Sequence, residues 1–137
     1  GWLPLMAEET MEAQFREEFY MSEVDRDAGL PQAVRVGGVV FVSATTAAGK
    51  DFETQMKTAY MRIQSVLASY GLTMDSVAHE RVYALDLAAF EKALPARRLF
   101  YPGTRSPATT WVEVSKLPGE GRLVAIEVMA VAEQEAE

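Results

Sequence analysis

The sequence predicts an α+β domain in which a mixed sheet is covered by two helices, with the elements in the order ββαβαββ. Three observations support this fold class. Two β-rich runs flank a Gly-Gly pair, a long apolar stripe recurs at helical spacing, and the last apolar run has the length of a strand. With 137 residues, 49% of them hydrophobic and 24% charged, the chain fits one globular domain with a single core.

Residues 1–27 are expected to be an acidic, partly helical N-terminal extension in front of a single domain over residues 28–137. The extension holds eight acidic and two basic residues, so nearly all of the net charge of −7 lies there. Gly1–Leu5 precede Met6, and they are either native or a remnant in front of the natural initiator.

An amphipathic helix is predicted between Met6 and Met21. Its apolar residues Met11, Phe15 and Phe19 recur at every fourth position among glutamates. Because short helices are marginal without packing, a frayed acidic tail is the alternative.

The first two strands of the domain form a predicted hairpin. Residues 33–36 and 39–43 are β-rich, and Gly37-Gly38 permits the positive φ angles of a two-residue turn. The helix that follows has Asp51 as its N-cap, an apolar stripe through Tyr70, and Gly71 as its left-handed end.

The second half of the chain is also predicted to contain both strands and helices. We expect a strand, a helix through Phe90 that resumes after Pro95, and two final strands joined by a Pro-Gly turn. Their ranges are 77–85, 86–101, 108–114 and 122–131.

Glu127 is the only carboxylate on the last strand, whose two faces are otherwise apolar. Such a strand is covered on both sides, here by helices on one face and by other subunits around a symmetry axis on the other. A carboxylate in that dry space is expected to have a raised pKa and to suit general acid and base catalysis. The alternative is a structural glutamate bonded to the backbone, or to Arg81 or Arg105 of a neighbouring chain.

Several classes of function are disfavoured by composition. Without cysteine, and with His79 as the sole histidine, the chain has no thiolate nucleophile and no multi-histidine metal cage, which leaves only an all-oxygen site open. The net charge of −7 disfavours nucleic acid as a partner. With no apolar run of membrane-spanning length and no signal sequence at its start, the chain is expected to be cytoplasmic and free of membrane contacts.

The domain resembles the RidA-like family of reactive imine and enamine deaminases over roughly residues 28–132. The resemblance is carried by the runs Pro31–Gly37, Phe41–Ser43 and Asp86-Leu87, by the C-terminal pattern Pro107-Ala108 with Val112-Glu113-Val114 and Leu117-Pro118, and by Ile126-Glu127. It implies a chorismate-mutase-like fold, a homotrimer whose sheets form a central barrel, and a ligand site in each cleft between subunits. It also implies a reaction without a cofactor, in which Glu127 positions or activates the hydrolytic water.

Five pocket positions depart from the family pattern. The arginine that binds the substrate carboxylate is replaced by Thr109, so we expect a substrate other than a simple imino acid, aromatic or otherwise apolar. The other departures put an apolar residue where the family has a tyrosine, a glycine, an asparagine or a small residue. They are Leu30, Ala44, Leu94 and Trp111.

Three further predictions concern the cleft. Thr109, Trp111 and Glu113 share one parity, so the hydroxyl and the indole could line the same cleft, with ordinary packing as the alternative for the indole. Ser43 and Thr45 lie at the strand end where the family places backbone donors near the ligand. Arg105 is the candidate substitute cation, although loop arginines mostly face solvent, and Arg97-Arg98 are expected on a solvated helix face.

The predicted function is hydrolysis, or deamination, of a small imine or enamine, or its tautomerisation. The alternative is a trimer that binds a small metabolite, or regulates, without catalysis. Ribonuclease activity, sometimes attached to this family, is disfavoured by the acidic charge.

Overall fold

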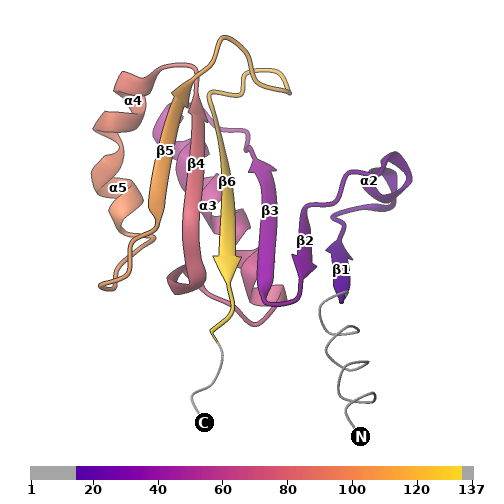
Figure 1. The fold of residues 1–137 in the computed structure, drawn as a ribbon. Helices are drawn as coiled ribbons and strands as arrows, with labels where there is room; N and C mark the ends of the chain where they lie inside the picture. Colours follow the sequence, from indigo (N-terminus) through magenta and orange to yellow (C-terminus); the bar gives the residue numbers. More distant parts are fainter. Residues whose placement is uncertain (1–14, 134–137) are drawn as a thin grey trace, which may run out of the picture.

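The computed structural model describes residues 15–133, which form one six-stranded sheet with one long helix behind it and short helices at its two edges (Figure 1). The strand order is β1-β2-β3-β6-β4-β5. Strands β4 and β5 pair parallel, and the other neighbours pair antiparallel, so the sheet is mixed as predicted.

The predicted hairpin and long helix are confirmed. β2 (Ala33–Val36) and β3 (Val39–Thr45) meet at a turn where Gly37 has a φ of 57°. Helix α3 (Phe52–Ser69) begins at Asp51, whose side chain accepts a hydrogen bond from the Thr54 amide at 2.8 Å. Gly71, with a φ of 75°, lies just beyond its end.

The second half of the chain also follows the prediction, with the interrupted helix present as two short ones. A single 3₁₀ turn precedes the first of these strands. The elements are η1 (Met74–Ser76), β4 (Val77–Ala84), α4 (Leu87–Lys92), α5 (Leu94–Arg98), β5 (Ala108–Glu113) and β6 (Val124–Val131). Pro95 lies in the first turn of α5, where its missing amide hydrogen costs nothing.

The helix predicted over Met6–Met21 is wrong for its last part, and residues 1–14 lie outside the described residues. β1 (Arg16–Phe19) pairs antiparallel with β2. As a strand, this segment gains backbone hydrogen bonds with the edge of β2. It also gains a contact between Phe19 and Tyr70, whose ring centroids are 6.5 Å apart, whereas a short helix without packing would be marginal. Within the described part of the extension, the helix is α2 (Glu23–Ala28), which Ser22 caps.

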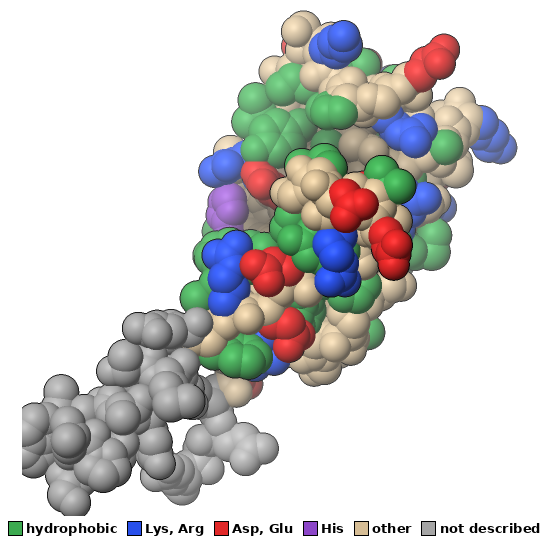
Figure 2. Space-filling model, turned by 90° about the vertical axis from the view of Figure 1, so that its right-hand side faces the viewer, with side chains coloured by type: hydrophobic (Ala, Val, Ile, Leu, Met, Phe, Trp, Pro, Cys, Tyr) green, Lys and Arg blue, Asp and Glu red, His purple; other side chains and the backbone are tan. Residues whose placement is uncertain are grey.

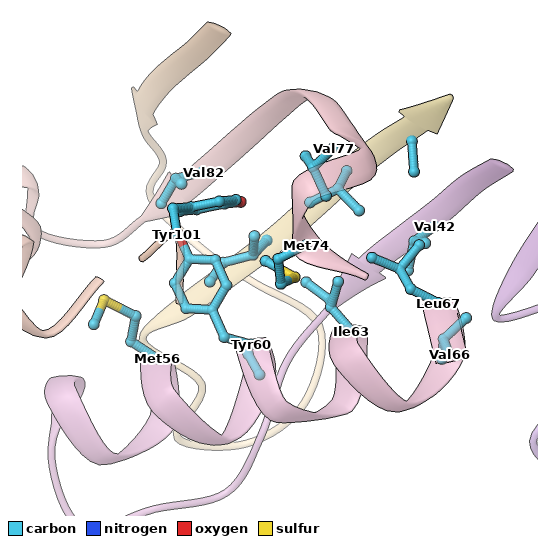
Figure 3. Close-up of a cluster of buried hydrophobic side chains, with 14 of the residues drawn as sticks. Val42, Met56, Tyr60, Ile63, Val66, Leu67, Met74, Val77, Val82 and Tyr101 are labelled. Atoms are coloured by element: carbon cyan, nitrogen blue, oxygen red, sulfur yellow. The ribbon is translucent and has the colours of Figure 1, made fainter. Parts of the chain in front are cut away.

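The core lies between the sheet and α3. Buried side chains from α3, from alternate positions of the strands, and from Met74 and Tyr101 outside these elements fill it, as Figure 3 shows. α3 runs behind the sheet and α4 and α5 lie beside β5, which leaves the front of the sheet uncovered in the single chain (Figure 1). We call this front the open face; it carries Phe41, Arg81, Tyr83, Thr110, Val112, Glu127, Met129 and Val131.

The outer surface carries mixed charge. In Figure 2, acidic and basic side chains alternate with apolar ones over the visible face, with no continuous basic area. None of the helices in residues 15–133 has the length and hydropathy needed to cross a membrane.

Candidate functional site

Two carboxylates on neighbouring strands organise polar groups on opposite faces of the sheet. Arg81 on β4 lies in register with Glu127 on β6 and with Thr110 on β5, so these three share the open face. Glu80 lies in register with Thr109, one position along, so both point toward the helices. The sheet therefore separates the two acids.

Glu127 is held on the open face by two side chains of β4. Its Oε1 accepts a hydrogen bond of 2.5 Å from the Tyr83 hydroxyl and one of 3.2 Å from Nη1 of Arg81. The adjacent Tyr83 oxygen, followed by the negative charge of Glu127, raises the pKa of Arg81, so the guanidinium stays charged. Glu127 is thus oriented as well as paired.

The single chain does not enclose Glu127 in a dry space. Its side chain keeps 33% of its exposure and that of Arg81 keeps 46%. Enclosure has to come from other subunits covering the open face, which stays a prediction. The alternative role predicted for Glu127 is a structural glutamate that bonds to Arg81 of a neighbouring chain. The structure has Glu127 paired with Arg81, but within the same chain.

The fully buried acid is Glu80, which the sequence analysis missed. Oε1 accepts from the hydroxyls of Tyr60 at 2.8 Å and Tyr101 at 2.9 Å. Oε2 accepts from Nε of Arg97 at 2.7 Å and from the Thr109 hydroxyl at 2.8 Å, and Nη2 of Arg97 lies 2.6 Å from it in an ion pair. We call these five residues the Glu80 cluster, in which each carboxylate oxygen has at least two donors.

The cluster is a polar network that reaches from the buried Glu80 to the edge strand β5, where Thr109 is exposed. Figure 3 shows Tyr60 rising from α3 toward Tyr101 among apolar side chains. Burial, followed by the charge of Glu80, raises the pKa of both tyrosines, so both hydroxyls remain donors. Burial alone would lower the pKa of Arg97, but the charge of Glu80 and the hydrogen bond with it outweigh burial and raise it.

The expectation that Arg97 lies on a solvated helix face is therefore wrong, because the buried carboxylate draws the guanidinium inward until only 12% of its side chain is exposed. Arg98 is exposed and donates to the Gly103 carbonyl. The signal for Glu80 was present in the sequence: Glu80 shares its parity with Val82 and Ala84, which face the core.

Thr109 and Trp111 lie on the same side of β5, as their parity predicts, but on the side opposite Glu127. The Thr109 hydroxyl donates to Glu80 and accepts from the Trp111 indole at 2.9 Å. The indole packs edge-on against Phe90 of α4, with 4.9 Å between ring centroids. Any site that joins these two residues to Glu127 has to use two subunits.

The remaining predicted site residues are scattered over the single chain. Leu30 is exposed in the loop before β2, and Leu94 begins α5 and packs on the core. Ser43 donates to the Pro31 carbonyl at 2.9 Å. Arg105 pairs with Glu133, and this hydrogen bond raises its pKa, so within residues 15–133 its cation is already matched by an acid.

Ala44 lines a groove of about 580 Å³ on the helix side of the sheet, between α3 and the end of β3. We call it the β3–α3 groove. Its lining residues are Phe19, Met21, Gln32, Ala44, Thr45, Thr46, Arg62, Ser65 and Val66.

The described part of the chain contains no group of three or more His, Asp or Glu side chains placed to hold a metal ion. Glu80 is saturated by protein donors and Glu127 has one guanidinium and one phenol beside it. Proton transfer and ligand binding are the chemistry that these groups offer directly.

Comparison with known proteins agrees with this geometry. A family model described as Endoribonuclease L-PSP matches residues 22–132. A RutC family protein of Saccharolobus solfataricus is 30% identical over 111 residues, which cover 75% of this chain and 85% of that protein. The chain belongs to the RidA/YjgF family.

Solved structures of the RidA/YjgF family share the fold of this member. A YjgF/YER057c/UK114 family protein from Mycobacterium tuberculosis is 31% identical, with a TM-score of 0.79 over 86% of this chain and all of that chain. A Rid family protein from Yersinia pestis is 27% identical, with a TM-score of 0.70 over 74% of this chain and 86% of that one. The predicted family is therefore confirmed, and so is the α+β fold with its mixed sheet.

Proposed function

We propose that this family member hydrolyses a small imine or enamine, or tautomerises it, with Glu127 as the group that moves the proton. The observation that carries the proposal is an accessible carboxylate fixed by Tyr83 and Arg81 in the middle of an uncovered sheet face. A carboxylate whose orientation is fixed before the substrate arrives needs little reorganisation during reaction.

The proposed steps balance without a cofactor. Glu127 takes a proton from water as the water oxygen attacks the imine carbon and the electron pair of the C=N bond moves to nitrogen, and it returns this proton to that nitrogen to give the carbinolamine. Glu127 then takes the hydroxyl proton of the carbinolamine as the carbonyl forms and delivers it to nitrogen as the C–N bond breaks, so that ammonia leaves and the carboxylate is regenerated. Tyr83, donating to the same carboxylate oxygen, orients it for both transfers.

A homotrimer is part of the proposal. The open face exposes apolar side chains, among them Phe41 at 48%, Val112 at 37% and Val131 at 40%, around a polar centre. Burial of this face by two further copies, in a central barrel of sheets, encloses Glu127 and brings the β5 edge of one subunit toward the Ser43 and Ala44 end of the next.

The substrate class follows from Thr109. Its hydroxyl is committed to Glu80 and Trp111 and carries no charge, so it cannot hold a substrate carboxylate as an arginine does. We therefore propose a substrate that is aromatic or otherwise apolar rather than a simple imino acid.

The test is ammonia release from freshly generated imines, with and without a carboxylate, together with molar mass by light scattering. We expect release faster than buffer from an apolar imine and a mass three times that of the chain. Release no faster than buffer from every imine, or a monomeric mass, contradicts the proposal.

The second candidate is a trimer that binds a metabolite without turning it over. The hydrogen bond from Thr109 to Glu80 favours it, because the residue at the position that holds the substrate in the family is here bonded to a buried carboxylate. Saturable binding of an apolar imine analogue, such as a ketone, without ammonia release from the matching imine would select this candidate.

A further inference from the structure

The β3–α3 groove has the size and the composition of a small-molecule site. Its volume of about 580 Å³ lies within the range of about 300–1,000 Å³ that is typical of ligand pockets. It opens on the helix side of the sheet, because Thr45, in its floor, is in register with the core residue Ile126. Within a single chain it is therefore separate from Glu127, which lies on the open face.

The charge of the groove is opposite to that of the chain. Among the described residues that line it, Arg62 is the only charged one, whereas the whole chain carries a net charge of −7. Arg62 is exposed and makes no ion pair with any described carboxylate. Within residues 15–133, no carboxylate supplies the counter-charge of its guanidinium.

The guanidinium is anchored while most of its donors stay available. Nη1 of Arg62 donates to the Thr46 carbonyl at 2.8 Å, which fixes the side chain along the groove. An arginine has five N–H donors, so several remain for a bidentate partner. Anchoring reduces the side-chain entropy that binding an anion would otherwise cost.

Neutral polar groups and an apolar wall complete the lining. Gln32 donates to the Thr45 hydroxyl at 2.9 Å, and Thr45 donates on to the Ser43 carbonyl at 2.8 Å, so this side of the groove is preorganised. Ser65 adds a hydroxyl from α3. Phe19, Met21, Ala44 and Val66 supply the apolar surface, and Phe19 is fixed by its contact with Tyr70.

We infer that the β3–α3 groove binds a small ligand that combines an apolar body with one anionic group, a carboxylate or a phosphate monoester, which Arg62 recognises. The aromatic and thioether side chains hold the body, and the guanidinium holds the anion. The inference does not depend on imine chemistry at Glu127.

The experiment is a binding titration of the full chain with benzoate, phenyl phosphate and benzyl alcohol as probes. Calorimetry measures the affinities, and amide chemical shifts locate the site. We expect at least one of the two anions to bind at least tenfold more tightly than the neutral alcohol, with shifts at Arg62, Ser65 and Thr46. The benzoate and phenyl phosphate arms decide which anion the groove prefers. Equal affinity for the alcohol and both anions, or shifts confined to the open face, overturns the inference.

Variants of exposed arginines provide the matched control. Arg62→Gln should weaken binding of the preferred anion about tenfold or more, Arg62→Lys less, and Arg98→Gln not at all, because Arg98 bonds only to the Gly103 carbonyl among the described residues. Unchanged affinity in Arg62→Gln overturns the inference. Glu127→Gln should keep the anion affinity, so loss of imine turnover and loss of groove binding are separate results.

Discussion

The two sides of the sheet use the same residue types for opposite purposes. On the helix side, Glu80 is fully buried and shared by two tyrosines, an arginine and a threonine. On the open face, Glu127 meets one tyrosine and one arginine and keeps a third of its exposure. The comparison shows that a carboxylate on a strand stays available for chemistry only where its hydrogen-bonding capacity is left partly unused.

The same contrast separates Arg97 from Arg62. Arg97 is the counter-ion of a buried acid and has become part of the core, whereas Arg62 bonds to a backbone carbonyl and keeps its charge for a ligand. Glu80 and Arg97 therefore neutralise each other inside the fold, whereas Glu127 and Arg62 bear the proposed functions.

The largest expected effect is on stability, and it tests the structural role of Glu80. Glu80→Gln keeps the shape but leaves Arg97 buried without a counter-ion, which costs about 3–5 kcal/mol of unfolding free energy. Urea unfolding followed by circular dichroism measures this. A loss below about 1 kcal/mol would show that the cluster does not depend on the charge.

The second expected effect is on alkaline stability. Tyr60 and Tyr101 have raised pKa values in the folded chain, so above their ordinary pKa near 10 the unfolded chain loses protons that the folded chain keeps. The contribution of these two tyrosines to the free energy of unfolding is therefore fully present below pH 10. Above pH 10 it falls by up to about 1.4 kcal/mol per pH unit for each tyrosine. Urea unfolding between pH 8 and 11.5 measures the slope, and Tyr101→Phe should make it shallower. Equal slopes would exclude Tyr101 as a contributor.

The third expected effect concerns the edge strand. Thr109→Val removes one donor to Glu80 and the acceptor of the Trp111 indole while keeping the side-chain volume, which costs about 1–3 kcal/mol. Urea unfolding gives the loss, and tryptophan fluorescence reports the freed indole. Thr110→Val on the open face is the matched control and should change stability by less than about 1 kcal/mol. Equal losses in the two variants would contradict the separation of the faces.

The smallest expected effect is the stability change in Glu127→Gln. Its ion pair with Arg81 is open to solvent on one side, and such partly exposed pairs contribute about 0–1 kcal/mol. Urea unfolding at low and high salt measures it. A loss as large as that of Glu80→Gln would make Glu127 a structural residue and remove the contrast between the faces.

The fold was largely predictable, because each element after residue 30 carries a local signal, such as Gly37 in the hairpin or Asp51 and Gly71 around α3. The Glu80 cluster was not, since four of its five members come from separate elements whose packing the chain order does not reveal. The parity of Glu80 with Val82 was the one usable sign. β1 was missed because a fourfold apolar spacing also fits a segment that pairs with an exposed edge.

Parity along one strand predicted which site residues share a side of that strand. It did not predict which residues of different strands lie on the same face of the sheet. Alternation places Thr109 and Trp111 together, yet only the register of β4 with β5 and β6 shows that Glu127 faces the other way. Gln55 gives a further example. It bonds to the carbonyls of Gly49 and Gly121 and to the Leu123 amide, joining α3 to two loops that no local pattern connects.

The most direct test is kcat/KM for ammonia release from an apolar imine by Glu127→Gln, relative to the unaltered chain. Both proteins are assayed without urea, at a pH where both are fully folded. We predict a loss of about 100-fold or more, because a carboxamide can neither accept nor return the proton. Turnover retained within about threefold, in a protein that is equally stable, would contradict the assignment of the chemistry to the open face.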